Sequence, residues 1–240
     1  MVHGFAQDRR CIGPLARAVA DRRVLLPDAP GHGGSWRHAG ADLEQGAQLL
    51  ADTTGPCVLV GYSMGGRLAL VTALARPDVV EALVLVDATA GIEDDDERAE
   101  RRRRDGELAD RLERIGVEAF VDEWLSSPML AGLPPWARFD DERRANRADA
   151  LASSLRRAGT GSMRPRWQQL SELDIPVLCI TGELDTRYGE LSRRMVTTIG
   201  ERARHHVVAG VGHAAHLEAP AETIRLVQNF LTALGRGVLD

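Results

Sequence analysis

The chain has 240 residues, of which 44% are hydrophobic and 27% are charged. This length buries one sizeable core and is too short for two ordinary domains. The formal net charge of −5 gives no electrostatic basis for sequence-independent binding to nucleic acid or to an anionic membrane. All 30 basic residues are arginine, so no lysine can form a Schiff base.

Cysteine content and the N-terminal sequence indicate in which cellular compartment the protein resides. The three cysteines, Cys11, Cys57 and Cys179, are odd in number and far apart, which fits a reducing environment better than a disulfide framework. No run of eighteen apolar residues is present, and the first residues lack the charged and apolar regions of a signal peptide. The sequence therefore predicts a cytoplasmic protein with no membrane partner.

Short apolar runs alternate with longer amphipathic stretches along the chain. Continuous hydrophobicity is typical of strands buried on both faces of a parallel sheet. Such runs predict strands at 23–26, 57–60, 82–86, 177–180 and 206–209. Helical spacing predicts helices at 14–21, 41–51, 65–75, 189–199 and 220–234. The expected class is α/β, with a mostly parallel central sheet flanked by helices.

Residues 90–169 interrupt this alternation, because they are rich in Arg, Asp and Glu and have helical periodicity without a convincing strand. We interpret them as a helical cap insertion over a core formed by residues 1–89 and 170–240. An alternative for the charged stretch at 93–104 is a solvated helix with internal ion pairs. Its position after the strand at 82–86 favours a ligand-binding role, since open sheets bind ligands at the carboxyl ends of their strands.

The motif Gly61-Tyr62-Ser63-Met64-Gly65 directly follows one predicted strand and precedes a predicted helix. This order is typical of a nucleophile elbow, in which a sharp turn holds the serine in a strained conformation. As a bare pattern G-x-S-x-G is weak, and the strand-turn-helix context makes it specific. The motif predicts Ser63 as a nucleophile.

A serine needs a histidine and an orienting acid to be activated. Asp185 follows the strand at 177–180, and His213 follows the strand at 206–209, so both lie at the same edge of the sheet as Ser63. We predict a triad of Ser63, His213 and Asp185, with Glu183 as an alternative acid. A purely local role for His213 is the structural alternative.

Other motifs complete or limit this site. The turn His3-Gly4-Phe5 is expected to supply the backbone N–H of Phe5, which with that of Met64 would form an oxyanion hole. The loop at 30–35 lacks the lysine of a phosphate loop and the spacing of a dinucleotide fingerprint. His213 and His216 have no third ligand at a suitable spacing, so we predict no metal, no cofactor and a structural role for His216.

The chain resembles the α/β-hydrolase superfamily over its whole length. The resemblance rests on residues 3–5, 30–35, 61–67, 182–185 and 210–216. Within the insertion, residues 99–105, 119–124 and 154–161 are similar to the 2-succinyl-6-hydroxy-2,4-cyclohexadiene-1-carboxylate synthases of menaquinone biosynthesis. Members of that family are lyases that eliminate pyruvate from a cyclohexene carboxylate.

This resemblance implies a small polycarboxylate as the substrate, and the triad as a base that acts without an acyl-enzyme. By the family's motifs, Arg67 and Arg101 should bind carboxylates and Trp124 should form an apolar wall, with Tyr62 and Arg187 as weaker candidates. A further arginine of the insertion is expected, among Arg143, Arg144 and Arg147. The protein would act as a monomer or a homodimer.

The family places a strand before the His-Gly-Phe turn, between the strands at 23–26 and 57–60, where this chain has only Met1 and Val2. Without that strand two ladders of backbone groups would stay unpaired. We therefore expect that the natural reading frame begins further upstream or that the chain is truncated. Equal melting temperatures with and without an upstream extension would contradict this expectation.

Two other functions fit the same sequence. A serine hydrolase acting on a small ester, thioester or vinylogous diketone would use the same triad with Ser63 acylated. A hydrolase-fold binding protein ranks third, because a pure binder has little physical need for an intact triad.

Overall fold

The computed structural model describes residues 1–17, 19 and 22–236. Within these residues one four-stranded parallel sheet has the order β1-β2-β3-β4. The strands are β1 (Cys57–Tyr62), β2 (Val80–Val86), β3 (Val177–Gly182) and β4 (Ala203–Val208). The helices are α1 (Gly13–Arg17), α2 (Leu43–Thr54), α3 (Met64–Ala75), α4 (Asp95–Leu125), α5 (Asp140–Arg144), α6 (Ala148–Ala158), α7 (Thr186–Ile199), α8 (Ala215–Glu218) and α9 (Pro220–Arg236).

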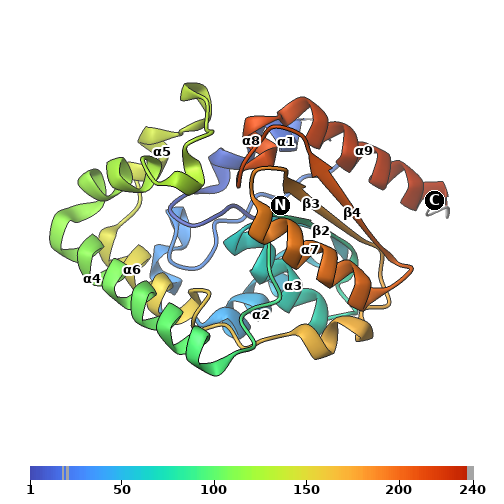
Figure 1. Cartoon of the computed structure of the whole chain (residues 1–240), viewed down its shortest axis with the longest axis horizontal. Helices are drawn as coiled ribbons and strands as arrows, with labels where there is room; N and C mark the ends of the chain where they lie inside the picture. Colours follow the sequence, from blue (N-terminus) through green and yellow to red (C-terminus); the bar gives the residue numbers. More distant parts are fainter. Residues whose placement is uncertain (18, 20–21, 237–240) are drawn as a thin grey trace.

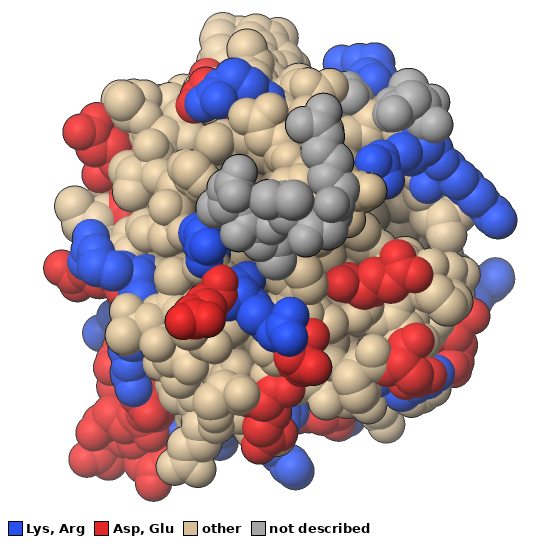
Figure 2. All heavy atoms as spheres, turned by 90° about the vertical axis from the view of Figure 1, so that its right-hand side faces the viewer, with Lys and Arg blue, Asp and Glu red and all other residues tan. Residues whose placement is uncertain are grey.

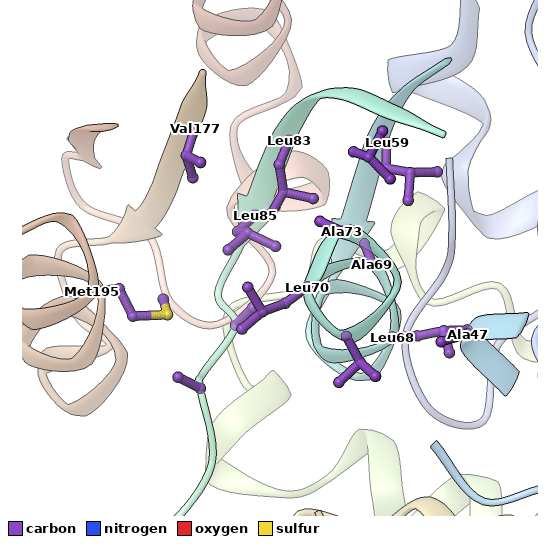
Figure 3. Close-up of a cluster of buried hydrophobic side chains, with 14 of the residues drawn as sticks. Ala47, Leu59, Leu68, Ala69, Leu70, Ala73, Leu83, Leu85, Val177 and Met195 are labelled. Atoms are coloured by element: carbon purple, nitrogen blue, oxygen red, sulfur yellow. The ribbon is translucent and has the colours of Figure 1, made fainter. Parts of the chain in front are cut away.

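Helices cover both faces of the sheet because alternate strand residues point to opposite sides. Leu83 and Leu85 of β2 belong to a buried cluster with α2, α3 and α7, and Figure 3 shows Leu70 of α3 beside Leu85. Val84 and Val86 belong to a second cluster, with α1 and α9. The strands are therefore apolar on both faces, as their continuous hydrophobicity predicted.

The α/β class and the parallel sheet are confirmed, as are the strands predicted at 57–60, 82–86 and 177–180. The strand predicted at 206–209 begins earlier, at Ala203, and ends at Val208. The four later predicted helices correspond to α2, α3, α7 and α9. The first is formed only as α1, and part of its predicted range lies outside the described residues.

The strand predicted at 23–26 is wrong, because these residues form no ladder. The backbone beside β1 on this side is Val2, whose N–H donates to Val60 O at 2.8 Å and whose carbonyl accepts from Tyr62 N at 3.1 Å. The Met1 ammonium group donates to Leu25 O at 2.8 Å. Because the bridge of Val2 is to Gly61, residues 23–26 receive a single terminal hydrogen bond from this side, which is too little to extend the sheet.

Helices α4, α5 and α6 gather on one side of the molecule, opposite α9 (Figure 1). Between 90 and 169 all described residues are helical, turn or irregular, as the sequence predicted. Asp94 caps α4 by accepting a hydrogen bond from Glu97 N. The helix breaks at Gly116, where φ is 80°, and its second part turns Phe120 toward α6. We retain the cap and core boundaries as a prediction.

Charged side chains of both signs lie on the face seen from the right of Figure 1, as Figure 2 shows. Among the described residues no helix combines the length and the apolarity needed to cross a membrane.

Candidate active site

Ser63 occupies a tight turn between β1 and α3. Its backbone has φ 49° and ψ −108°, a region that is strained for a residue with a side chain. A Cβ at Gly61 would lie 2.3 Å from Gly65 O, and a Cβ at Gly65 would lie 2.4 Å from Val2 O. Only glycine therefore fits at these two positions, which explains the spacing of the motif around the serine.

Ser63, His213 and Asp185 form a continuous hydrogen-bonded chain. The Oγ of Ser63 lies 3.0 Å from Nε2 of His213, and Nδ1 of His213 lies 2.5 Å from Oδ2 of Asp185. The His213 side chain is 4% exposed and that of Asp185 is 14% exposed. This is the geometry of a nucleophile or proton carrier, a base and an orienting acid.

The alternative acid, Glu183, faces a different part of the loop. Its Oε2 accepts a hydrogen bond from Gly210 N at 2.8 Å, whereas Asp185 reaches His213. Asp185 also caps α7 by accepting from Tyr188 N at 3.4 Å. The geometry therefore favours Asp185 over Glu183 as the partner of His213.

The loop that carries His213 is held by the carboxylate of Glu218. Oε2 of Glu218 accepts from Gly212 N at 2.8 Å, and Oε1 accepts from Ala214 N at 3.0 Å. These N–H groups belong to the residues on either side of His213. Glu218 therefore limits the movement of the imidazole relative to Ser63.

The His-Gly-Phe turn is fixed by its own histidine. His3 is fully buried, and its Nε2 accepts from Ala29 N at 3.0 Å, so the proton is on Nδ1, which donates to Gly4 O at 2.8 Å. Gly4 N donates to Gln7 Oε1 at 2.8 Å. Desolvation lowers the pKa of His3 and favours this neutral form. The turn places Phe5 in the wall of the cavity that Met64 also lines.

A cavity of about 820 Å³ lies between the sheet and helices α4 to α6, within the size range of small-molecule sites. All ten residues that the sequence placed in the site line this cavity. They are Phe5, Tyr62, Ser63, Met64, Arg67, Arg101, Trp124, Asp185, Arg187 and His213. Their shared location is established, while their individual roles stay predictions.

Two buried arginines line the cavity without forming an ion pair with a described carboxylate. Arg67 is 7% exposed, and its Nη1 donates to Ala158 O at 2.7 Å. Arg143 is 1% exposed, and its guanidinium donates to the carbonyls of Arg138 and Ala6. Desolvation lowers the pKa of Arg67 to about 10, so it stays charged at neutral pH. Both guanidinium groups can offer a charge to an anionic ligand.

The other two arginines considered for this position are engaged elsewhere. Arg144 forms ion pairs with Glu118, Asp122 and Asp140. Arg147 pairs with Asp149 at 3.0 Å, and its guanidinium lies 4.6 Å from the ring of Trp36. Of the three candidates, Arg143 is the one that lines the cavity.

Arg101 and Arg187 line the cavity but already have carboxylate partners. Nε of Arg101 is 2.8 Å from Asp105, and Nη2 of Arg187 is 2.9 Å from Glu97. Arg187 is largely exposed. Their charges are partly compensated, so each has less to offer an anionic ligand than Arg67 or Arg143.

Aromatic rings form two other walls. The ring of Trp124 is 5.4 Å from that of Phe5 and 6.0 Å from that of Phe120. The rings of Tyr188 and Tyr62, which also line the cavity, lie 4.6 Å and 5.7 Å from that of His213. These rings limit access of water to the imidazole.

Sequence reasoning missed three residues around His213. Tyr188 is one turn after Asp185, Glu218 is five residues after His213, and Asp87 directly follows β2 at the same sheet edge as Ser63. The position of Asp87 after a buried apolar run is a signal that could have identified it.

His216 packs against Tyr62 with a 4.3 Å ring separation, and it does not line the cavity.

One group in the described part of the chain has the composition of a metal site. Ligand atoms of Asp87, Asp185 and His213 all lie within 4.8 Å of one another. Both ring nitrogens of His213 are engaged by Ser63 and Asp185, and both oxygens of Asp87 accept backbone hydrogen bonds. These contacts suit a proton relay better than a cation, so the absence of a metal stays our prediction.

A family model described as alpha/beta hydrolase family matches residues 1–226. A Bacillus subtilis (strain 168) protein is 32% identical over 97% of this chain and 89% of its own length, and its name provisionally assigns it as a 2-succinyl-6-hydroxy-2,4-cyclohexadiene-1-carboxylate synthase. An Enterobacter sp. (strain 638) protein with the same enzyme name is 30% identical over 92% of this chain and 86% of its own.

A solved structure also resembles this chain in three dimensions. The solved structure of MenH from S. aureus has a TM-score of 0.89 and 28% identity, covering 96% of this chain and 91% of that one. The similarity thus extends over nearly the whole chain, residues 90–169 among them.

Proposed function

We propose, from the premise that this chain belongs to the alpha/beta hydrolase family, that it is a lyase of menaquinone biosynthesis. The proposed substrate is 2-succinyl-5-enolpyruvyl-6-hydroxy-3-cyclohexene-1-carboxylate. The products are pyruvate and 2-succinyl-6-hydroxy-2,4-cyclohexadiene-1-carboxylate, after which the similar proteins from Bacillus subtilis and Enterobacter are named. The observation that carries the proposal is that the Ser63–His213–Asp185 chain shares one cavity with two buried arginines that form no ion pair with any carboxylate of the described residues.

The arginines support a substrate with several carboxylates. A guanidinium group binds a carboxylate through two parallel N–H···O bonds, and such bonds are strengthened by charge and by exclusion of water. Arg67 extends from α3, one turn after Ser63, and Arg143 extends from α5 in the proposed cap. Two carboxylates of one ligand would therefore connect the core to the cap across the cavity.

The proposed elimination uses the triad as a base. His213 accepts the proton of the Ser63 hydroxyl at Nε2, and Ser63 Oγ removes the acidic ring proton of the substrate. The ring C–O bond to the enolpyruvyl group breaks as the new C=C bond forms. The leaving group takes up a proton from His213 and becomes pyruvate, so no water is consumed and no acyl-enzyme forms.

Electrostatic groups surround the charge that develops on the substrate. We propose that the N–H groups of Phe5 and Met64 face the enolate-like oxygen. Asp185 stabilises the imidazolium form of His213 through the hydrogen bond to Nδ1. Trp124 and Tyr188 restrict water around the reacting atoms. We further propose that residues 90–169 act as the cap that closes over the bound ring.

Product mass tests this function against the serine hydrolase that the same triad would also serve. After incubation with the substrate, the proposed lyase gives pyruvate and a cyclohexadiene. Hydrolysis of the enol ether would also release pyruvate but leave a ring product heavier by one water. Mass spectrometry of the ring product separates the two reactions, and release of pyruvate with the hydrated ring, or no release, contradicts the lyase proposal.

A further inference from the structure

Asp87 is a fully buried carboxyl group next to the triad, at the end of β2. Its backbone has φ 47°, a left-handed conformation that is uncommon for a residue other than glycine, asparagine or aspartate. Asp87 does not line the cavity, so it cannot touch a ligand there. Any effect of Asp87 on the site must therefore be transmitted through neighbouring residues.

The two oxygens of Asp87 reach two different loops. Oδ1 accepts a hydrogen bond from Gly182 N at 3.3 Å, and Oδ2 accepts one from Ala215 N at 3.4 Å. Gly182 ends β3 three residues before Asp185, and Ala215 lies two residues after His213. One carboxyl group therefore connects the loop of the triad acid to the loop of the triad base.

The backbone of Asp87 adds a third attachment. Asp87 N donates to Ile180 O at 2.9 Å, which fixes the end of β2 against β3. Ser63 N donates to Val86 O at 2.9 Å, so the nucleophile turn is attached to the residue just before Asp87. The segment 86–87 thus contacts the backbone of all three triad-bearing segments.

Burial of the Asp87 carboxyl group is energetically unfavourable, because the group loses its contact with water. Asp87 forms no ion pair with any described cation, and burial, with Asp185 nearby, raises its pKa well above the usual range. An apolar side chain of similar size would avoid the desolvation of a carboxyl group. It would also leave Gly182 N and Ala215 N without an acceptor.

We propose that Asp87 is a positioning residue that ties the Asp185 loop to the His213 loop and so sets the hydrogen bond between these two side chains. The inference rests on the proposed triad and is independent of which substrate the triad serves. Small displacements of a base from its partner cost much of the rate, because reactivity depends steeply on geometry.

A covalent serine probe tests this inference without the substrate. A fluorophosphonate reacts with Ser63 only when His213 activates the hydroxyl, so its maximal inactivation rate reports the alignment of the triad, and its apparent binding constant reports the cavity. In Asp87→Asn one N–H keeps an acceptor while the other faces an amide donor. We expect the inactivation rate to fall about tenfold in Asp87→Asn and about a hundredfold in Asp87→Ala, with unchanged binding.

The controls separate positioning from general loss of stability. Thr72 is fully buried in α3, and its hydroxyl donates to Leu68 O at 2.8 Å, away from the cavity. Thr72→Ala removes a buried hydrogen bond and should keep the wild-type inactivation rate. Ser63→Ala should not react at all.

The results distinguish the positioning role of Asp87 from the existence of the triad. A wild-type rate in folded Asp87→Asn overturns the positioning role and leaves the triad intact. Equal slowing in Thr72→Ala also overturns it, since destabilisation alone would then explain the effect. Wild-type protein that the probe does not label, or labels equally in Ser63→Ala, overturns the triad itself and the inference with it.

Discussion

Arginine side chains in this protein differ in what surrounds their charge. Arg67 and Arg143 are buried beside the cavity and pair with no carboxylate in the described part of the chain, whereas Arg144 forms ion pairs with acidic residues of α4. A buried guanidinium without a counter-ion is costly unless a ligand supplies the negative charge. At the scale of the residue, the missing counter-ion is therefore the strongest sign of an anionic ligand.

Replacement of Arg67 measures this contribution. Because a charge-assisted hydrogen bond contributes about 1.5–3 kcal/mol, Arg67→Ala should raise KM for the substrate about 10- to 100-fold. Steady-state pyruvate release at varied substrate concentration gives the value. Arg144→Ala, the matched control, should leave KM unchanged, and an equal increase in both variants would remove the proposed role of Arg67.

The triad residues could be predicted because the elbow motif and the strand ends indicate them, whereas Arg67, Arg101 and Trp124 were expected only from the resemblance to the family. The choice among Arg143, Arg144 and Arg147 could not be predicted, since α5 has only five residues and begins after Phe139 in a left-handed conformation. So short a helix gives no periodicity from which an inward face can be predicted. The site position of Arg143 depends on contacts with Ala6, 137 residues away in the chain.

At the scale of the element, the contact between β1 and α3 determines whether Ser63 is presented correctly. The helix begins directly after the strand, and the backbone of the turn approaches itself more closely than any Cβ allows. The strain at Ser63 is stable only because the packing of β1, α3 and Val2 leaves no alternative.

A single methyl group at Gly61 should therefore disrupt this element. Its Cβ would lie 2.3 Å from Gly65 O, so we expect Gly61→Ala to lower the free energy of unfolding by more than about 3 kcal/mol. Urea unfolding measures the change. Gly106→Ala in α4 meets nothing within 4 Å and should stabilise the protein by up to about 1 kcal/mol. Equal stability of the two variants would contradict the close approach.

Whether a predicted strand forms depends on whether a neighbouring strand pairs with it. Strands β1, β2 and β3 have neighbours whose ladders match their apolar runs, so local sequence and tertiary pairing agree. Residues 24–26 are also apolar, but on this side the described backbone offers them one hydrogen bond from the Met1 ammonium group to Leu25 O, while Val2 pairs with Gly61. Strand formation depends on a partner, which no local pattern contains.

At the scale of the whole molecule, buried histidines make stability depend on pH. Burial lowers the pKa of His32 and of His216 to about 3, from 6.5 in the unfolded chain. Below pH 6.5 the unfolded state therefore binds more protons than the folded state. The free energy of unfolding should fall as the pH decreases from about 6.5 toward 3, by up to about 1.4 kcal/mol per pH unit for each histidine.

His216 offers a direct test, because neither of its ring nitrogens has a hydrogen-bond partner among the described residues. His216→Phe should reduce the difference in unfolding free energy between pH 7 and pH 5 by about 2 kcal/mol. Urea unfolding at both pH values gives this difference. A His216→Phe variant that keeps the wild-type difference would show that burial of His216 does not affect its protonation.

We propose that Ser63, activated by His213 and Asp185, carries the proton in an elimination that releases pyruvate. The most direct measurement is the rate of pyruvate release from 2-succinyl-5-enolpyruvyl-6-hydroxy-3-cyclohexene-1-carboxylate by the wild type and by Ser63→Ala, followed with a coupled lactate dehydrogenase assay. We predict rapid release by the wild type and a fall in kcat of about 10²- to 10⁴-fold in the variant. Wild-type turnover in folded Ser63→Ala would contradict the proposed role of Ser63.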